Sequence, residues 1–270
     1  MDNSVNEHDF MLGLEQNAMD SLEHGVEHFV NGEKPTDLKY TILHTFHAVE
    51  LFLKARLAKV NPQLIFTRNH YTVDYRSLID RLENAGVNLS EQNRHDLDAL
   101  RGIRNSIEHH QIQRNRRDIE HYLGRAMYFL DSFLQHELGI NLEEQLDEDT
   151  YRTLSEALYS YKERLEKANE RVKKVCEEME RDAFIEKIPY LCERLRCEEC
   201  GEETVIIPDP TSHDDKVHCF FCEARFFVET CELCGSYMLT SLNSHLKSDI
   251  DEPNICEYCW DEFNYRVEHD

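Results

Sequence analysis

The first half of the chain repeats apolar residues at the spacing of amphipathic helices. Apolar side chains recur every three or four residues around Leu14 to Phe29, and again from Ile119 to Leu134. The segment LKYTILHTFHAVELFLKARLAKV, residues 38–60, is instead apolar around much of its circumference, which predicts a central helix. The pattern therefore predicts an all-helical domain over residues 1–140.

Capping residues and helix breakers suggest where these helices begin and end. Thr36 or Asp37 is a suitable N-cap for the second helix, Pro62 ends it, Gly86 closes the third, and Ser90 caps the fourth. The expected helices cover about residues 5–30, 37–61, 75–86, 90–110 and 114–138.

A different periodicity follows the acidic segment NLEEQLDED. Apolar residues alternate steps of three and four over four heptads, as in a coiled coil. They are Tyr151, Leu154, Leu158, Tyr161, Leu165, Ala168, Val172, Val175 and Met179. We expect a long helical connector over 141–190 that self-associates through this seam; a helix packed on its own chain would use the same residues.

The last third of the chain holds eight cysteines in four Cys-x-x-Cys pairs. Two such pairs supply the four thiolates of a closed tetrahedral zinc site, in which no position is left for a reacting water. Gaps of 18 and 21 residues favour grouping the pairs in order, although a crossed grouping is also possible. The expected ligands are Cys197, Cys200, Cys219 and Cys222 for one Zn²⁺, and Cys231, Cys234, Cys256 and Cys259 for a second.

Short apolar runs between these pairs predict small β-strands. Gly201 and Gly235, directly after two of the pairs, suit sharp turns, and Cys176 and Cys192 are expected to stay free thiols. We place a domain boundary near Pro189. The predicted fold is mainly α, with a helical domain at 1–140, the connector at 141–190, and zinc ribbons at 191–230 and 231–270.

Charge narrows the range of partners. The formal net charge is −24, and residues 191–270 hold 19 acidic residues against 6 Lys and Arg. This argues against broad affinity for nucleic acid and suggests that the ribbons contact a protein. No apolar run reaches the ~18 residues of a membrane span, and MDNSVNEHDF lacks the pattern of a secretory signal. We expect a cytoplasmic protein that uses no membrane.

One segment reverses the charge balance. The segment from Arg94 to Arg117 contains six arginines and only three acidic residues, and it includes the stretch RGIRNSIEHH. This basic island is a candidate anion site. On a regular helix Arg104 and His109 point ~140° apart, so either the helix bends or the arginine reaches around it. A plain surface ion pair between Arg104 and Glu108 is the alternative.

The hexapeptide from Arg104 to His109, RNSIEH, resembles the Arg-x4–6-His motif of the HEPN superfamily. The helix over 37–58 is also similar to the long second helix of bacterial HEPN proteins. The resemblance covers about residues 5–140 and implies a metal-independent endoribonuclease, often a toxin or an antiviral-defence effector, that acts as a homodimer with the motif at the subunit cleft.

The resemblance also implies roles for individual residues. His109 would be the general acid or base at the ribose 2′-hydroxyl, with His110 as the alternative. Arg104 would stabilise the charge on the phosphorane, and Asn105 would orient the histidine or a phosphate oxygen. His47 and Glu50 would line the cleft or simply pack between helices. Candidate contacts to the RNA backbone are Arg101, Arg114, Arg116 and Arg117.

The expected function is therefore RNA cleavage that needs no metal cofactor, carried out by a homodimer with two structural Zn²⁺ per chain. The alternative is a non-catalytic dimeric scaffold, in which the helical domain self-associates and the ribbons bind a protein partner.

Overall fold

The computed structural model describes residues 13–109, 115–186, 192–207, 216–241, 254–256 and 259–260. It is mainly helical, with small antiparallel strands in the C-terminal region, which confirms the predicted fold class. The chain divides into two compact units, Met1–Lys162 and Glu163–Asp270. The division falls within one long helix, so the expected connector belongs partly to each unit. Among the described residues, no helix combines the length and the apolar character needed to cross a membrane.

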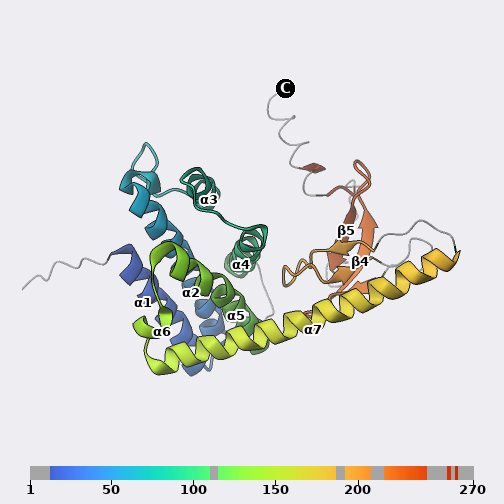
Figure 1. Cartoon of the computed structure of the whole chain (residues 1–270), viewed down its shortest axis with the longest axis horizontal. Helices are drawn as coiled ribbons and strands as arrows, with labels where there is room; N and C mark the ends of the chain where they lie inside the picture. The colour runs from blue at the N-terminus through green and yellow to red at the C-terminus, as the bar shows by residue number, and fades with distance from the viewer. Residues whose placement is uncertain are drawn as a thin grey trace, which may run out of the picture. The chain divides into compact units, whose positions relative to one another are not determined.

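The first unit is a helical bundle around one central helix, α2 (Figure 1). Helices α1, α3, α4 and α5 all pack against α2, which is apolar enough to face them all. The elements are α1 (Leu14–Asn31), α2 (Pro35–Val60), η1 (Pro62–Ile65), α3 (Tyr75–Asn84), α4 (Glu91–His109), α5 (Arg116–Phe133), the π-helical turn η2 (Leu134–Leu138), α6 (Leu142–Gln145) and the start of α7 (Glu148–Glu186).

Most helix ends lie where the sequence predicts them. Ser90 accepts the Asn93 N–H at 3.1 Å as the cap of α4, and Gly86 has the positive φ, 82°, that closes α3. The second helix starts earlier than expected, at Pro35, with Lys34 as its N-cap. Asp37 is instead the third helical residue, and its carboxylate accepts the Lys34 N–H at 2.9 Å. An acidic side chain there satisfies a free amide at the start of the helix.

A buried ionic network joins three helices of the first unit. Arg125 of α5 and Asp96 of α4 are almost fully buried, with Nε and Oδ1 3.5 Å apart. Gln92 donates to the same carboxylate at 3.1 Å, and Arg125 donates to the Tyr161 hydroxyl of α7 at 3.3 Å. Removing one partner would leave a buried charge uncompensated, so these residues fix how α4, α5 and α7 meet.

The apolar seam of α7 is covered by its own chain. Leu154 belongs to the core of the first unit, and Leu158 packs against that core. Val172 is buried in the second unit, where Val175 and Met179 pack against it. The seam therefore packs on its own chain within each unit, and self-association through the connector stays a prediction. The pattern alone predicts an apolar face, and this face has an intramolecular partner.

The second unit combines the end of α7 with two small sheets. The strands are β1 (Arg194–Leu195), β2 (Val205–Ile206), β3 (Lys216–His218), β4 (Arg225–Thr230) and β5 (Tyr237–Ser241). β1 pairs with β2, and β4 lies between β3 and β5, all antiparallel. Arg164 of α7 donates to the Phe221 carbonyl at 2.6 Å, and its guanidinium lies 5.0 Å from the centroid of that ring.

One expectation about the cysteines is wrong. Cys176 of α7 and Cys192, just before β1, form a disulfide, with their Cα atoms 5.4 Å apart. They were expected to be free thiols because they lie outside the four pairs. The second unit has a small apolar core of Val172, Cys176 and Ile206, and Cys192 packs against it. Packing of this kind brings the two sulfurs together, and their spacing in the sequence does not reveal it.

Candidate functional site

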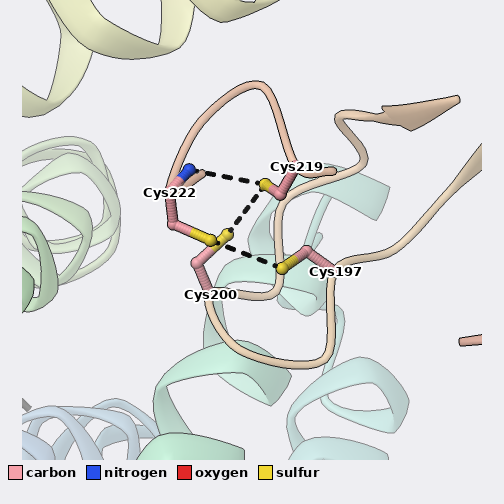
Figure 2. A group of neighbouring side chains, drawn as sticks. All are labelled: Cys197, Cys200, Cys219 and Cys222. Atoms are coloured by element: carbon pink, nitrogen blue, oxygen red, sulfur yellow. Dashed lines mark hydrogen bonds between the residues drawn. The ribbon is translucent and has the colours of Figure 1, made fainter. Parts of the chain in front are cut away.

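Two turns of the second unit bring four cysteines together (Figure 2). Cys197 and Cys200 follow β1, and Cys219 and Cys222 follow β3. The sulfurs of Cys197 and Cys222 are 3.6 Å apart, as are those of Cys200 and Cys219. Four sulfurs at ~2.3 Å from one tetrahedral zinc would lie ~3.8 Å from each other. The donor set and its spacing therefore fit a metal ion.

Each of these turns depends on a residue with positive φ. Gly201 has φ 78° and donates to the Cys197 carbonyl at 2.8 Å, as the sequence led us to expect. Glu223 occupies the same place after the second pair, with φ 65°, and donates to the Cys219 carbonyl at 2.9 Å. The sequence pattern did not indicate Glu223, because side-chain-bearing residues rarely adopt this conformation.

Nearby donors favour a thiolate at Cys219. The Cys222 N–H donates to its sulfur at 3.4 Å, and the Thr204 hydroxyl lies 3.1 Å away. Contacts with the other three thiols lower the pKa of Cys219. Contacts with Cys197, Cys219 and Cys222, together with burial, raise the pKa of Cys200, so Cys219 ionises more readily than Cys200. A cluster that shares protons in this way is suited to a cation, which replaces the protons.

The second cluster has a similar design. Cys234 and Cys256 have sulfurs 3.7 Å apart, and Cys231 and Cys259 lie with them. The Cys256 N–H donates to the Cys231 sulfur at 3.3 Å. Backbone N–H groups of Cys234 and Cys256 lower the pKa of Cys231 to about 6. This thiol is therefore mostly ionised at neutral pH, ready to bind a metal.

The pairs group in chain order, as predicted, and not in the crossed arrangement. Strand β4 runs between the two clusters: it begins soon after Cys222 and ends directly before Cys231. Because β4 pairs with β3 on one side and β5 on the other, the two expected ribbons share one three-stranded sheet. The centres are thus linked by backbone hydrogen bonds.

In the first unit, Arg104 lies at the edge of the buried face of α4. Its guanidinium forms an ion pair with Glu108 and donates to the Asn105 side-chain oxygen at 3.1 Å. Helix α4 is α-helical through His109. The side chain of His109 lies outside the described part of the chain.

Arg104 also acts on α2 through its charge. Partial burial lowers the pKa of His47; the Glu50 carboxylate opposes this shift, and the cations Lys54 and Arg104 add to it. Lys54 is itself almost buried and donates to Glu50 at 2.5 Å. His47 is therefore a neutral imidazole near pH 7, and charges on both α2 and α4 act on it.

The remaining arginines of the basic island have different surroundings. Arg101 lies 5.0 Å from the centroid of the Tyr75 ring, and Arg116 lies 4.3 Å from that of Phe29. Arg117 is exposed at the start of α5. His110 and Arg114 lie outside the described residues. Cation–π contacts on an aromatic face leave the outer edge of a guanidinium available to an anion.

Comparison with protein-family models, with curated proteins and with solved structures gives no match for this chain.

Proposed function

We propose that the chain is a metal-independent endoribonuclease of the HEPN type, with Arg104, Asn105 and His109 as its active residues. The observation that carries this proposal is the position of Arg104, whose guanidinium contacts the Asn105 side chain on α4 and whose charge acts on His47 of α2. An arginine whose charge reaches a neutral imidazole suits the cleavage of a phosphodiester.

The proposed reaction uses the 2′-hydroxyl of RNA as its nucleophile. A neutral histidine removes the 2′-hydroxyl proton, the oxygen attacks the adjacent phosphorus, and the 5′-oxygen leaves with a proton from an acid. His109 takes the first or second of these roles, and His47 is a further candidate for the other. Arg104 stabilises the dianionic phosphorane, for which it must exchange part of its contact with Glu108.

We propose Zn²⁺ for the two four-cysteine centres and a structural role for both. Four thiolates fill the tetrahedral shell, and the small apolar core of the second unit gains stability from metal binding. Cys197→Ser and Cys231→Ser should each lower the zinc content by one ion per chain. Unchanged zinc content in both variants would contradict the assignment.

The enzymatic proposal is tested with a mixed-sequence single-stranded RNA and the full chain in EDTA, in incubations short enough to keep thiolate-bound zinc. Wild type should give 2′,3′-cyclic phosphate ends and leave the 2′-deoxy oligonucleotide intact. His109→Ala and Arg104→Ala should each reduce the rate at least ~100-fold. His110→Ala tests the alternative histidine: it should cleave like wild type if His109 is the active residue.

Matched controls come from the same chain. Arg152→Ala removes another helical arginine that pairs with an acidic residue, Asp149. His136→Ala removes an exposed histidine whose Nδ1 lies 2.7 Å from the Ser132 carbonyl. Both controls should cleave like wild type. Equal cleavage by His109→Ala, Arg104→Ala and wild type would reject the active-site assignment.

The scaffold alternative is favoured by one contact, the ion pair between Arg104 and Glu108, which an ordinary exposed helix face would also form. If the chain is a scaffold, wild type should cleave no RNA under any of these conditions. Sedimentation of wild type tests the homodimer that both functions share.

A further inference from the structure

Three histidines gather on one face of the α1–α2 pair, far along the sequence from the cysteine centres. His24 and His28 are one turn apart on α1, and His44 lies opposite on α2. Ring centroids are 4.8 Å apart for His24 and His28, 4.5 Å for His24 and His44, and 5.7 Å for His28 and His44. One nitrogen from each ring lies within 4.8 Å of the others.

The backbone is shaped so that these rings can meet. Gly25, next to His24, lies against α2: a Cβ there would be 3.0 Å from the Thr45 hydroxyl and 3.3 Å from the Thr41 carbonyl. The absence of a side chain at this position lets α1 and α2 approach closely. That approach places His44, the neighbour of Thr45, within reach of the α1 histidines.

An acidic residue supports one of the rings from behind. The His28 Nδ1 lies 3.4 Å from a carboxylate oxygen of Asp37, whose other oxygen accepts the Lys34 N–H. Gly32 makes room for this arrangement, because a Cβ there would lie 2.2 Å from the Asp37 Cβ. A carboxylate that holds one nitrogen of a histidine orients the other nitrogen toward a metal, as in many zinc sites.

The surroundings also favour a cation over a free cluster of imidazoles. Asp20 precedes His24 by one helical turn and lies close enough for its charge to act on His44.

We propose that His24, His28 and His44 form a third metal site, which binds Zn²⁺ through three imidazoles and leaves one position for water or an external ligand. Three zinc-bound nitrogens at ~2.05 Å lie ~3.3 Å apart, so the rings must close in from their present spacing. His24 is exposed, and rotation of its side chain provides much of this movement. Metal-free stacking of the three rings is the competing explanation.

The test uses the full chain with zinc already bound at the thiolates. ZnCl₂ alone is titrated into this sample, and calorimetry measures the binding. Wild type should take up one further ion per chain. Co²⁺ added in place of ZnCl₂, to a fresh sample of the same chain, should give d–d absorption without the thiolate charge-transfer bands that cobalt shows at cysteine centres. His24→Ala, His28→Ala and His44→Ala should each abolish this uptake at micromolar metal.

Two further variants distinguish the metal ligands from Asp37, which contacts His28 without binding the metal, and from a histidine outside the site. Asp37→Asn should weaken binding ~10- to 100-fold while preserving one ion per chain. His136→Ala should bind like wild type. Circular dichroism confirms that each variant is folded, and His24→Ala, at an exposed position, is the decisive one. Absence of a further ion in wild type, or its retention in His24→Ala and His44→Ala, would overturn the proposal. RNA cleavage does not enter this readout.

Discussion

At the scale of single residues, three of the turns that carry cysteines each contain a residue with positive φ. Gly201 and Gly235 have φ of 78° and 75°, and Glu223 has 65° in the equivalent place. Left-handed backbone is readily available to glycine but costs other residues ~1–2 kcal/mol. The turn at Glu223 is therefore the strained one of the three.

We predict that Glu223→Gly raises the free energy of unfolding by ~1 kcal/mol, because it relieves this strain. Gly235→Ala should lower it by a similar amount; its Cβ would meet nothing within 4 Å, so the loss comes from the backbone alone. Urea titration of the zinc-loaded chain measures both. Glu223→Gln, which removes the charge and keeps the strain, is the control, and a gain in this variant as large as in Glu223→Gly would contradict the explanation.

At the scale of helices, the crossing of α5 and α7 depends on Gly124. A Cβ at this position would lie 2.3 Å from the Ala157 carbonyl oxygen and 2.6 Å from the Tyr161 Cβ. Neither backbone nor Cβ can rotate away, so the two helices would have to separate. The adjacent Arg125 supports the same crossing through its hydrogen bond to the Tyr161 hydroxyl.

Gly124→Ala should therefore destabilise the first unit by ~1–3 kcal/mol, through overpacking at a helix crossing. Gly102→Ala is the matched control on α4, where a Cβ would meet nothing within 4 Å. It should stabilise the chain by ~0.5–1 kcal/mol, because alanine is the better helix former. Thermal unfolding followed by helical circular dichroism compares them, and a similar effect of both substitutions would argue against the close crossing.

At the scale of the whole molecule, the ten cysteines have two different uses. Eight lie in the two four-cysteine groups that could hold a metal ion, and Cys176 and Cys192 form the disulfide. Their sequence separation of 16 corresponds to a loop whose closure stabilises a chain by ~3 kcal/mol.

Chain purified without reductant, then denatured with chelator present, should therefore show eight reactive thiols, and ten after reduction. Cys176→Ser should show nine, because Cys192 loses its partner. The same variant should unfold at lower denaturant concentration than wild type. Ten thiols before reduction would show that the disulfide does not form in solution.

Features of the fold and of the candidate sites could be predicted where the residues that form them are neighbours in the sequence. Ser90 caps the start of α4 and Gly86 closes α3, both as expected, because caps act over three or four residues. The His24-x3-His28 spacing was available as a sign of a metal site. Its third member, His44, was not apparent, because only the packing of α1 on α2 brings it near.

The sequence by itself determined the helical class, the apolar face of α7 and the four Cys-x-x-Cys pairs, since periodicity and Cys-x-x-Cys turns are local properties of the chain. Tertiary structure alone decided that the α7 seam packs on its own chain and that Cys176 meets Cys192. It also placed Arg104 where its charge acts on His47. These contacts join distant segments whose approach depends on close packing at particular residues, which no local pattern encodes.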